Sequence, residues 1–405
     1  MTRLFFAVPD YYPPWRLDVD ELFAQQMPKF GMVVTWSMRR DIAGPCILTE
    51  HRGQSVYLPL KFPVNGVVGK IINKLTQYAC EVVLFSHLLF GPHFDIIQVR
   101  DRRYLFAFFG WLVARAQGAK FIYWSSYPFP EHLMEMGLAK QGVARAFYWL
   151  YGQLSWFYVY RFIMLVADHV FVQSEQMLRN VSGYGVPAEK MTSVSMGVPP
   201  RILDWAKFHT KKSVRRGEVV YVGTLARVRR MGVIIEAFSL VRKCNSNVHL
   251  IMVGQGDTPD EQLELEVLVS QLGLTHDVTF TGFMPMEKAW DRVARAEVCL
   301  SPIYPTPVLD VGSPTKLIEY MALGRPVVAS KHPEQTAILS ESGAGLCVSW
   351  GAESFAKAIL ELLRNPEIAN RMGACGPPWV EANRTYDKLA AEVYVRYRIL
   401  LGEKF

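Results

Sequence analysis

Short apolar runs alternate along the chain with longer segments whose apolar positions recur every three or four residues. The runs are typical of buried strands, and the longer segments are typical of helices that cover a sheet. Strands are predicted in the first half at 4–8, 33–38, 95–99, 120–124, 169–173 and 191–195. Strands are predicted in the second half at 219–222, 248–253, 278–281, 298–301, 327–329 and 345–348. Regular alternation of this kind predicts an α/β fold with parallel, doubly wound sheets.

A break in this pattern divides the chain. Residues 196–200 read Met-Gly-Val-Pro-Pro, and a basic stretch follows at 207–216. A chain of 405 residues is also too long for one hydrophobic core. We therefore expect a Rossmann-like domain at 1–200, a linker at 201–216 and a second Rossmann-like domain at 217–378. A helical segment at 379–405 ends the chain.

The composition excludes several classes of protein. The net charge of +7 favours an anionic partner, but the chain has no basic block of the kind that binds nucleic acid. Six cysteines without paired spacing indicate neither a disulfide framework nor a zinc site. The first apolar run ends at Pro9 and is too short for a signal peptide. A cytoplasmic protein in a reducing compartment is expected.

The segment from Leu309 to Lys331 carries the strongest chemical signal. Lys316, Glu319 and Leu323 fall on one face of a predicted helix, which ends at Gly324 before a buried strand. A helix N-terminus offers free N–H groups to phosphate, and an acidic side chain beside it can bind ribose hydroxyls. The alternative is a solvated pair on a helix surface, worth a few tenths of a kcal/mol.

Two further loops have the form of a phosphate or nucleotide site. The strand at 219–222 leads into Gly223 and a basic loop with Arg227 and Arg229, whose guanidinium groups can pair with diphosphate oxygens. Arginines at a strand end are also common on surfaces. The next strand leads into Gly254-x-Gly256, a turn that closes many strand–helix units and is weak evidence alone.

The stretch 313–330, SPTKLIEYMALGRPVVAS, resembles the nucleotide-sugar motif of retaining GT-B glycosyltransferases of the GT4 type, the glycosyl transferases group 1 family. The resemblance implies two Rossmann-like domains facing a cleft, with the last helix crossing back to the N-terminal domain. It implies that Glu319 grips the donor ribose. Many members have a further glutamate upstream; here Val311 replaces it, as in the subset with Ser-Pro-x-Lys, and Asp310 is its candidate substitute.

The resemblance also orders the donor site. The family's loop arginine falls on Thr224, for which Arg227 is a candidate replacement, and the loop lysine falls on Arg229. Gly254 and Gly256 would approach the base, with Gly282 and Phe283 beside it. The residues expected to bind the donor are Gly223, Thr224, Arg227, Arg229, Gly254, Gly256, Gly282, Phe283, Asp310, Gly312, Ser313, Pro314, Thr315, Lys316, Leu317 and Glu319.

The N-terminal half resembles the family loosely. Asp18 is expected either to contact the acceptor or to cap a helix, and Arg100 and Ser126 follow the ends of two predicted strands. Asp18 and Asp20 superficially match a metal-binding Asp-x-Asp, but alternate residues at a helix start diverge, so no metal is expected. The residues expected to act in catalysis are Asp18, Arg100, Ser126, Arg229 and Lys316.

Residues 142–165 are dense in aromatic side chains and interrupted by Arg145 and Arg161. The uninterrupted apolar part is shorter than the ~20 residues that cross a bilayer. The segment is predicted either to lie on a membrane surface or to form a core helix of the first domain.

The resemblance implies a retaining, metal-independent enzyme that moves a hexose from a UDP- or GDP-sugar to a hydroxyl acceptor. A lipid-linked saccharide in bacterial surface polysaccharide synthesis is the expected acceptor, at the inner face of the plasma membrane. No cofactor other than the donor is expected. A catalytically silent GT-B scaffold and a nucleotide-sugar epimerase remain alternatives.

Overall fold

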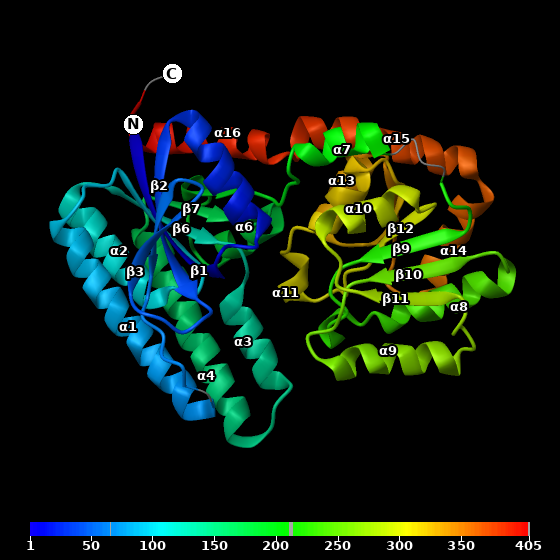
Figure 1. Cartoon of the computed structure of the whole chain (residues 1–405), viewed down its shortest axis with the longest axis horizontal. Helices are drawn as coiled ribbons and strands as arrows, with labels where there is room; N and C mark the ends of the chain where they lie inside the picture. The colour runs from blue at the N-terminus through cyan, green and yellow to red at the C-terminus, as the bar shows by residue number, and fades with distance from the viewer. Residues whose placement is uncertain (65, 210–213, 404–405) are drawn as a thin grey trace. The chain divides into compact units, whose positions relative to one another are not determined.

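The computed structural model describes residues 1–64, 66–209 and 214–403, and the chain divides into two compact units. Unit 1 comprises Met1–Ser195 together with Tyr386–Phe405, and unit 2 comprises Met196–Thr385. Each unit is an α/β structure with helices on both faces of one sheet (Figure 1). The α/β prediction is confirmed.

Unit 1 is built on a sheet with the strand order β3-β4-β2-β1-β5-β6-β7-β8. The strands are β1 (Thr2–Tyr12), β2 (Met32–Arg40), β3 (Ile47–His51), β4 (Gln54–Leu58), β5 (Ile96–Arg100), β6 (Lys120–Ser125), β7 (His169–Val172) and β8 (Met191–Ser193). All neighbouring pairs are parallel except β3 with β4. The parallel strands are buried on both faces, which explains their nearly continuous apolar sequences.

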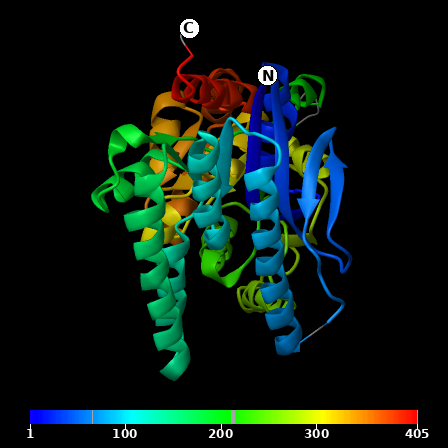
Figure 2. The same ribbon diagram turned by 90° about the vertical axis from the view of Figure 1, so that its left-hand side faces the viewer.

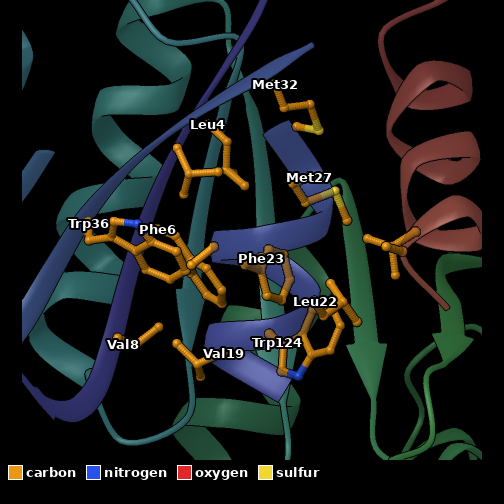
Figure 3. Packing of buried hydrophobic residues seen from close by; sticks show 14 of the residues in the cluster. Leu4, Phe6, Val8, Val19, Leu22, Phe23, Met27, Met32, Trp36 and Trp124 are labelled. Atoms are coloured by element: carbon orange, nitrogen blue, oxygen red, sulfur yellow. The ribbon is translucent and has the colours of Figure 1, made fainter. Parts of the chain in front are cut away.

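The helical elements of unit 1 are η1 (Asp18–Gln26), η2 (Met27–Phe30), α1 (Gly66–Phe90), α2 (Tyr104–Gln117), α3 (Phe129–Leu138), α4 (Gly142–Tyr158), η3 (Val159–Ile163), α5 (Met164–Val166), α6 (Glu175–Gly183), η4 (Ala188–Lys190) and α16 (Tyr386–Leu400). Figure 3 shows η1 placing Phe23 against Phe6, Trp36 and Trp124. The last helix, α16, packs against η1, and the Tyr397 hydroxyl donates to Gln98 Oε1 at 2.6 Å.

Unit 2 is built on a parallel sheet with the strand order β11-β10-β9-β12-β13-β14. The strands are β9 (Glu218–Val222), β10 (His249–Val253), β11 (Val278–Gly282), β12 (Val298–Ser301), β13 (Val327–Ser330) and β14 (Gly345–Val348). The helical elements are α7 (Arg201–His209), η5 (Arg227–Arg229), α8 (Gly232–Cys244), α9 (Pro259–Gln271), α10 (Met286–Arg295), α11 (Pro307–Asp310), α12 (Thr315–Ala322), α13 (Pro333–Ser342), α14 (Ala352–Arg364) and α15 (Pro366–Asn383). Two apolar clusters cover the two faces of this sheet.

The structure differs from the expected boundaries in two places. Residues 201–209 of the expected linker form α7, which buries Ile202 and Leu203 in the core of unit 2; residues 210–213 lie outside the described part. The second difference is at the other end, where all of α15 belongs to unit 2, which continues to Thr385. Both segments contain many polar residues, as a linker does. Their few regularly spaced apolar residues nevertheless pack into the core of unit 2.

Candidate functional site

Three glycines end neighbouring strands of unit 2 and pack against one another. The Gly223 N–H donates to the Val253 carbonyl at 2.9 Å, and the Gly254 N–H donates to the Gly282 carbonyl at 3.0 Å. Gly254 has φ +135°, and a Cβ there would lie 2.0 Å from the Gly223 carbonyl oxygen. These glycines therefore allow the loops at the carboxyl ends of β9, β10 and β11 to meet backbone to backbone. Such an edge is where parallel sheets bind ligands.

Gly256 has a local explanation of its own. A Cβ at this position would lie 2.8 Å from Glu261 Cβ, because Glu261 folds back to cap the start of α9. The glycine is therefore required by the helix cap that follows it. The structure explains Gly254 and Gly256 by packing within the protein, and contact with a base stays a prediction.

Lys316 lies at the N-terminal end of α12 beside the end of β9. Its Nζ is 3.1 Å from the Tyr221 hydroxyl and 4.4 Å from the centre of the Tyr221 ring. A Cβ on Gly223 would lie 3.0 Å from the same Nζ, so the lysine occupies space that only glycine leaves. The helix is fixed by Tyr320, whose hydroxyl accepts from the Val222 N–H at 2.7 Å. Lys316 is thus held rigidly at a strand end.

Burial disfavours the charged forms of both ionisable side chains at this position. Burial lowers the pKa of Lys316 well below its ordinary value, and Arg229 lowers it further. Burial raises the pKa of Glu319 to about 7, although neighbouring Trp290 and Lys316 act in the opposite direction. Lys316, Glu319 and Arg229 are therefore brought together, as the sequence predicts. A solvated surface pair would show no such burial, so that alternative is not supported.

Arg227 does not join this group. Its side chain is exposed and pairs with Glu264, with Nε 3.1 Å from Oε2 and Nη2 2.5 Å from Oε1. Its backbone N–H donates to Glu261 Oε1 at 3.0 Å. Thr224, at the family's arginine position, is exposed and offers its carbonyl to the Tyr221 hydroxyl at 2.9 Å. Arg227, the candidate replacement for the family's loop arginine, therefore pairs with Glu264 on the surface of unit 2.

The loop before α12 is tied to the rest of unit 2. Ser313 Oγ accepts from the Met196 N–H at 2.8 Å and donates to Glu334 Oε1 at 2.9 Å. Glu334 also pairs with Arg384 at 3.3 Å. Ser313 therefore holds the segment where the chain enters unit 2, at Met196, and through Glu334 the segment where it leaves, at Arg384. Sequence spacing alone did not indicate this structural role.

The other predicted donor residues fall into three environments. Leu317 is completely buried in the core, and its N–H donates to the Pro314 carbonyl at 3.2 Å, so its contact with the donor stays a prediction. Asp310 is half-buried, and burial raises its pKa while His332 lowers it. Phe283 is 76 % exposed and available to a ligand. Gly312, in the loop before α12, and Thr315, the first residue of α12, are half-buried.

The predicted catalytic residues of unit 1 also come together. Arg100 Nη2 is 2.5 Å from Asp18 Oδ2, and Arg100 Nε is 3.2 Å from Asp101 Oδ2. Asp101 Oδ1 accepts from the Ser126 N–H at 2.7 Å, and Asp101 Oδ2 accepts from the Ser126 hydroxyl at 2.5 Å. Asp101, which sequence reasoning passed over, is the residue that joins Arg100 to Ser126. Its φ of +48° at the end of β5 is unusual for a residue other than glycine.

This cluster is internally neutralised. Burial opposes ionisation of Asp18, but Arg100 and Arg16 outweigh it, so the pKa of Asp18 is lowered to about 2. Burial raises the pKa of nearby Asp10, while Arg100 and Arg16 lower it in part. Arg100 is completely buried, and its partners Asp18 and Asp101 are nearly so. Arg100 therefore positions Asp18 and Asp101, and its contact with substrate stays a prediction. Asp18 points to Arg100 and Arg16, and it does not cap the helix.

The two aspartates of the Asp-x-Asp sequence diverge. Asp20 pairs with His51 at 2.7 Å and with Arg52 at 2.9 Å, both in the β3–β4 hairpin. Asp18 faces Arg100 on the other side of η1. Among the residues that the structure describes, no group of three or more His, Cys, Asp or Glu side chains is placed to hold a metal ion.

The aromatic segment after residue 142 forms α4, η3 and α5. Many large apolar side chains of α4 are exposed: Val143, Phe147, Trp149, Leu150, Tyr151, Leu154 and Phe157. Val159, Tyr160 and Ile163 of η3 are buried, so only the second part of the segment is core. None of the described helices is long and apolar enough to cross a membrane.

Comparison with known proteins supports this picture. Residues 216–365 match the family model described as glycosyl transferases group 1. A glycosyltransferase of amylovoran biosynthesis from Erwinia amylovora is 26 % identical over 48 % of this chain and 48 % of its own. A GDP-mannose-dependent phosphatidylinositol monomannoside mannosyltransferase from Mycobacterium tuberculosis is 30 % identical over 55 % of this chain and 59 % of its own. The matched segment thus spans about half the length of these curated relatives.

A solved structure extends the likeness to nearly the whole chain. Sucrose-phosphate synthase from Thermosynechococcus elongatus superposes with a TM-score of 0.74 at 19 % identity, covering 99 % of this chain and 100 % of the other. Two doubly wound units, together with the likeness to solved structures of GT-B glycosyltransferases, define the GT-B fold. Residues 216–365, within the second unit, match the glycosyl transferases group 1 family model, in agreement with the resemblance. The family match and the named relatives support a transferase enzyme.

Proposed function

We propose that the protein is a retaining glycosyltransferase that moves a hexose from a UDP- or GDP-sugar to a hydroxyl of a lipid-linked saccharide. The observation that carries the proposal is the half-buried group of Lys316, Arg229 and Glu319 at the N-terminal end of α12. Two cations with a single carboxyl beside them suit a diphosphate, and that carboxyl suits ribose hydroxyls.

The burial of Lys316 indicates how the site promotes reaction. When a nucleoside diphosphate departs from the sugar, negative charge grows on its phosphate oxygens. A lysine fixed by Tyr221 and supported by Arg229 meets this charge without reorganising. A bound diphosphate also removes the reason for the lowered pKa of Lys316, because an anion favours the charged amine. On this proposal no metal ion is needed to neutralise the leaving group.

Unit 1 is the proposed acceptor-binding unit. Its neutralised cluster fixes the loops after β1, β5 and β6, and Ser126 and Asp18 lie on those loops. The exposed apolar side chains of α4, together with Arg145 and Lys140 near its start, fit a helix that rests on an anionic membrane surface. The relatives named above act in amylovoran synthesis and on a phosphatidylinositol mannoside. We therefore propose a membrane-associated acceptor in surface polysaccharide or glycolipid synthesis.

The test is donor turnover. The purified protein is incubated with UDP- and GDP-hexoses, and released nucleotide is measured with and without a polyprenyl-diphosphate-linked saccharide. We expect slow hydrolysis of one donor, faster release with acceptor, and an α-linked product from an α-linked donor. Release of no nucleotide from any donor would favour a silent scaffold. Exchange of configuration at the sugar without transfer would indicate an epimerase.

A further inference from the structure

A large apolar cavity lies in unit 1, away from the clusters described above. It has a volume of about 840 Å³, within the ~300–1,000 Å³ that small-molecule sites usually have. It lies between α1 and the β3–β4 hairpin, two elements that stand beside each other in Figure 2. Its walls are mostly carbon, from residues such as Leu58, Leu60, Phe62, Ala79 and Leu84. A cavity of this size and lining favours a hydrocarbon occupant.

The floor of the cavity is polar, and its charged side chains already have partners within the protein. Arg103 Nε lies 2.9 Å from Glu81 Oε1, and both side chains are almost completely buried. Arg103 also donates to Ser37 Oγ at 3.0 Å. The acidic side chain of the floor, Glu81, is therefore paired directly with Arg103, and it offsets the charges of Arg39 and Lys74 only in part.

A second, basic pocket of about 420 Å³ adjoins the cavity, and Pro59, Leu60 and Gln77 line both. It is lined by Arg39, Lys70 and Lys74, none of which forms an ion pair within the described ranges of the chain. Arg39 Nε is buried without a hydrogen-bond partner there. Burial and the neighbouring Arg39 lower the pKa of Lys74, which confirms that positive charge is crowded at this place. Crowded, unpaired cations favour a phosphate ligand.

The two pockets follow one another along a single helix. Lys70 and Lys74 face the basic pocket, and residues from Thr76 to His87 face the apolar cavity. At 1.5 Å per residue, the apolar part extends roughly 16 Å along α1. α1 also exposes Ile71, Leu75 and Val82, an apolar surface suited to a membrane.

We propose that these joined pockets bind a lipid phosphate, with the phosphate at Arg39, Lys70 and Lys74 and the hydrocarbon chain in the cavity. This site is separate from the nucleotide site of unit 2. Its use to hold the lipid of a lipid-linked acceptor rests on the proposed function, but the binding itself does not.

The probe is farnesyl phosphate, titrated into the full-length protein in detergent-free buffer by calorimetry. Farnesol lacks the phosphate, and inorganic phosphate lacks the chain. We expect farnesyl phosphate to bind at least tenfold more tightly than either. Equal binding of farnesyl phosphate and farnesol would overturn the phosphate assignment, and absence of binding would overturn the site.

Matched variants locate the ligand. Ala79→Trp fills the cavity from an exposed position on α1, and Ala144→Trp adds the same side chain to an exposed position on α4. We expect Ala79→Trp to weaken farnesyl phosphate at least tenfold and Ala144→Trp to leave it unchanged. The double variant Lys70→Gln and Lys74→Gln should weaken farnesyl phosphate and leave farnesol unchanged. Equal affinity in Ala79→Trp and the unaltered protein would contradict the proposal.

Native cysteines give an independent readout. Cys46 and Cys80 line the cavity, whereas exposed Cys244 lies on α8 in unit 2. Bound farnesyl phosphate should slow maleimide labelling of Cys46 and Cys80 and leave Cys244 unaffected; uniform labelling would argue against the cavity. Nucleotide binding measured on the same samples separates the two ideas. Absence of lipid binding in a protein that binds nucleotide would contradict only the lipid site. Absence of nucleotide binding in a protein that binds farnesyl phosphate would contradict only the proposed function.

Discussion

Each unit of the protein buries a group of charged side chains where its parallel strands end, yet the two groups differ in balance. In unit 1, Arg100 lies between Asp18 and Asp101, and the pKa of Asp18 is lowered to about 2. In unit 2, the pKa of Lys316 is lowered and that of Glu319 is raised to about 7. The first group stabilises its own charges. In the second group burial outweighs the attraction between Lys316 and Glu319, and an anionic ligand would favour the charged lysine.

The largest effect on stability should come from removing Arg100, the central cation of the charged group in unit 1. Arg100→Leu leaves Asp18 and Asp101 buried without their cation, and we expect the free energy of unfolding to fall by about 3–5 kcal/mol. Lys316→Met removes a charge that burial disfavours more than Glu319 favours it, so stability should be unchanged or slightly higher. Chemical denaturation of both variants at pH 7 measures the difference. An equal loss in the two variants would show that the groups do not differ as described.

The same Lys316→Met variant should lose activity although it keeps stability. If Lys316 meets the charge of the departing diphosphate, kcat should fall by roughly 10²–10³, the cost of removing one preorganised donor. Steady-state donor turnover checks this, with Lys243→Met on α8 as a matched surface control. Turnover unchanged in Lys316→Met would remove the lysine from the mechanism.

The pH dependence of nucleotide affinity should report Glu319. Ribose hydroxyls donate to the ionised carboxyl, whose pKa in the free protein is about 7. Binding therefore favours release of the proton, and affinity should rise as pH increases, being roughly tenfold weaker at pH 6 than at pH 8. Because the pKa of Lys316 is lowered, affinity should fall again at alkaline pH.

Calorimetry across this range, in phosphate-free buffers, measures the profile. Glu319→Gln should remove the acid limb, and Lys316→Arg should remove the alkaline limb, since arginine stays charged. An acid limb that persists in Glu319→Gln would assign it to another group.

The smallest effect should come from the exposed arginine of the β9–α8 loop. Arg227 pairs with Glu264 on the surface, so Arg227→Ala should change nucleotide affinity less than twofold. Arg229 acts directly on Lys316, and Arg229→Ala should weaken binding by about tenfold. Parallel titrations compare them. A larger loss in Arg227→Ala would restore the sequence assignment of this residue to the diphosphate.

The same contrast explains what the sequence could predict. The buried parallel strands were predictable, because strands covered on both faces give continuous apolar runs. The β3–β4 hairpin was not, because its edge strand β3 carries Glu50, His51 and another polar residue, a composition typical of a loop. The expected boundaries, at 201–216 and at 379, differ from those of the two units. Around the first, α7 buries only a few apolar residues among many polar ones, so its sequence resembles a linker.

The candidate site was predictable only in part. Lys316 and Glu319 stand at helical spacing after a proline, so their pattern is local. Asp101 and Tyr221 act through partners that folding brings from distant strands, and no spacing indicates them. Leu317 belongs to the same motif, but its side chain is part of the core. Motif membership therefore gives the segment, and burial decides which of its residues face the ligand.

The central claim is that the unbalanced group of unit 2 is a nucleotide site. The most direct test is calorimetry of UDP and GDP, with and without magnesium, on the unaltered protein and on Glu319→Ala. The account predicts that one nucleotide binds tightly, that magnesium changes little, and that Glu319→Ala loses at least tenfold in affinity. Binding of neither nucleotide, or equal binding by Glu319→Ala, would contradict it.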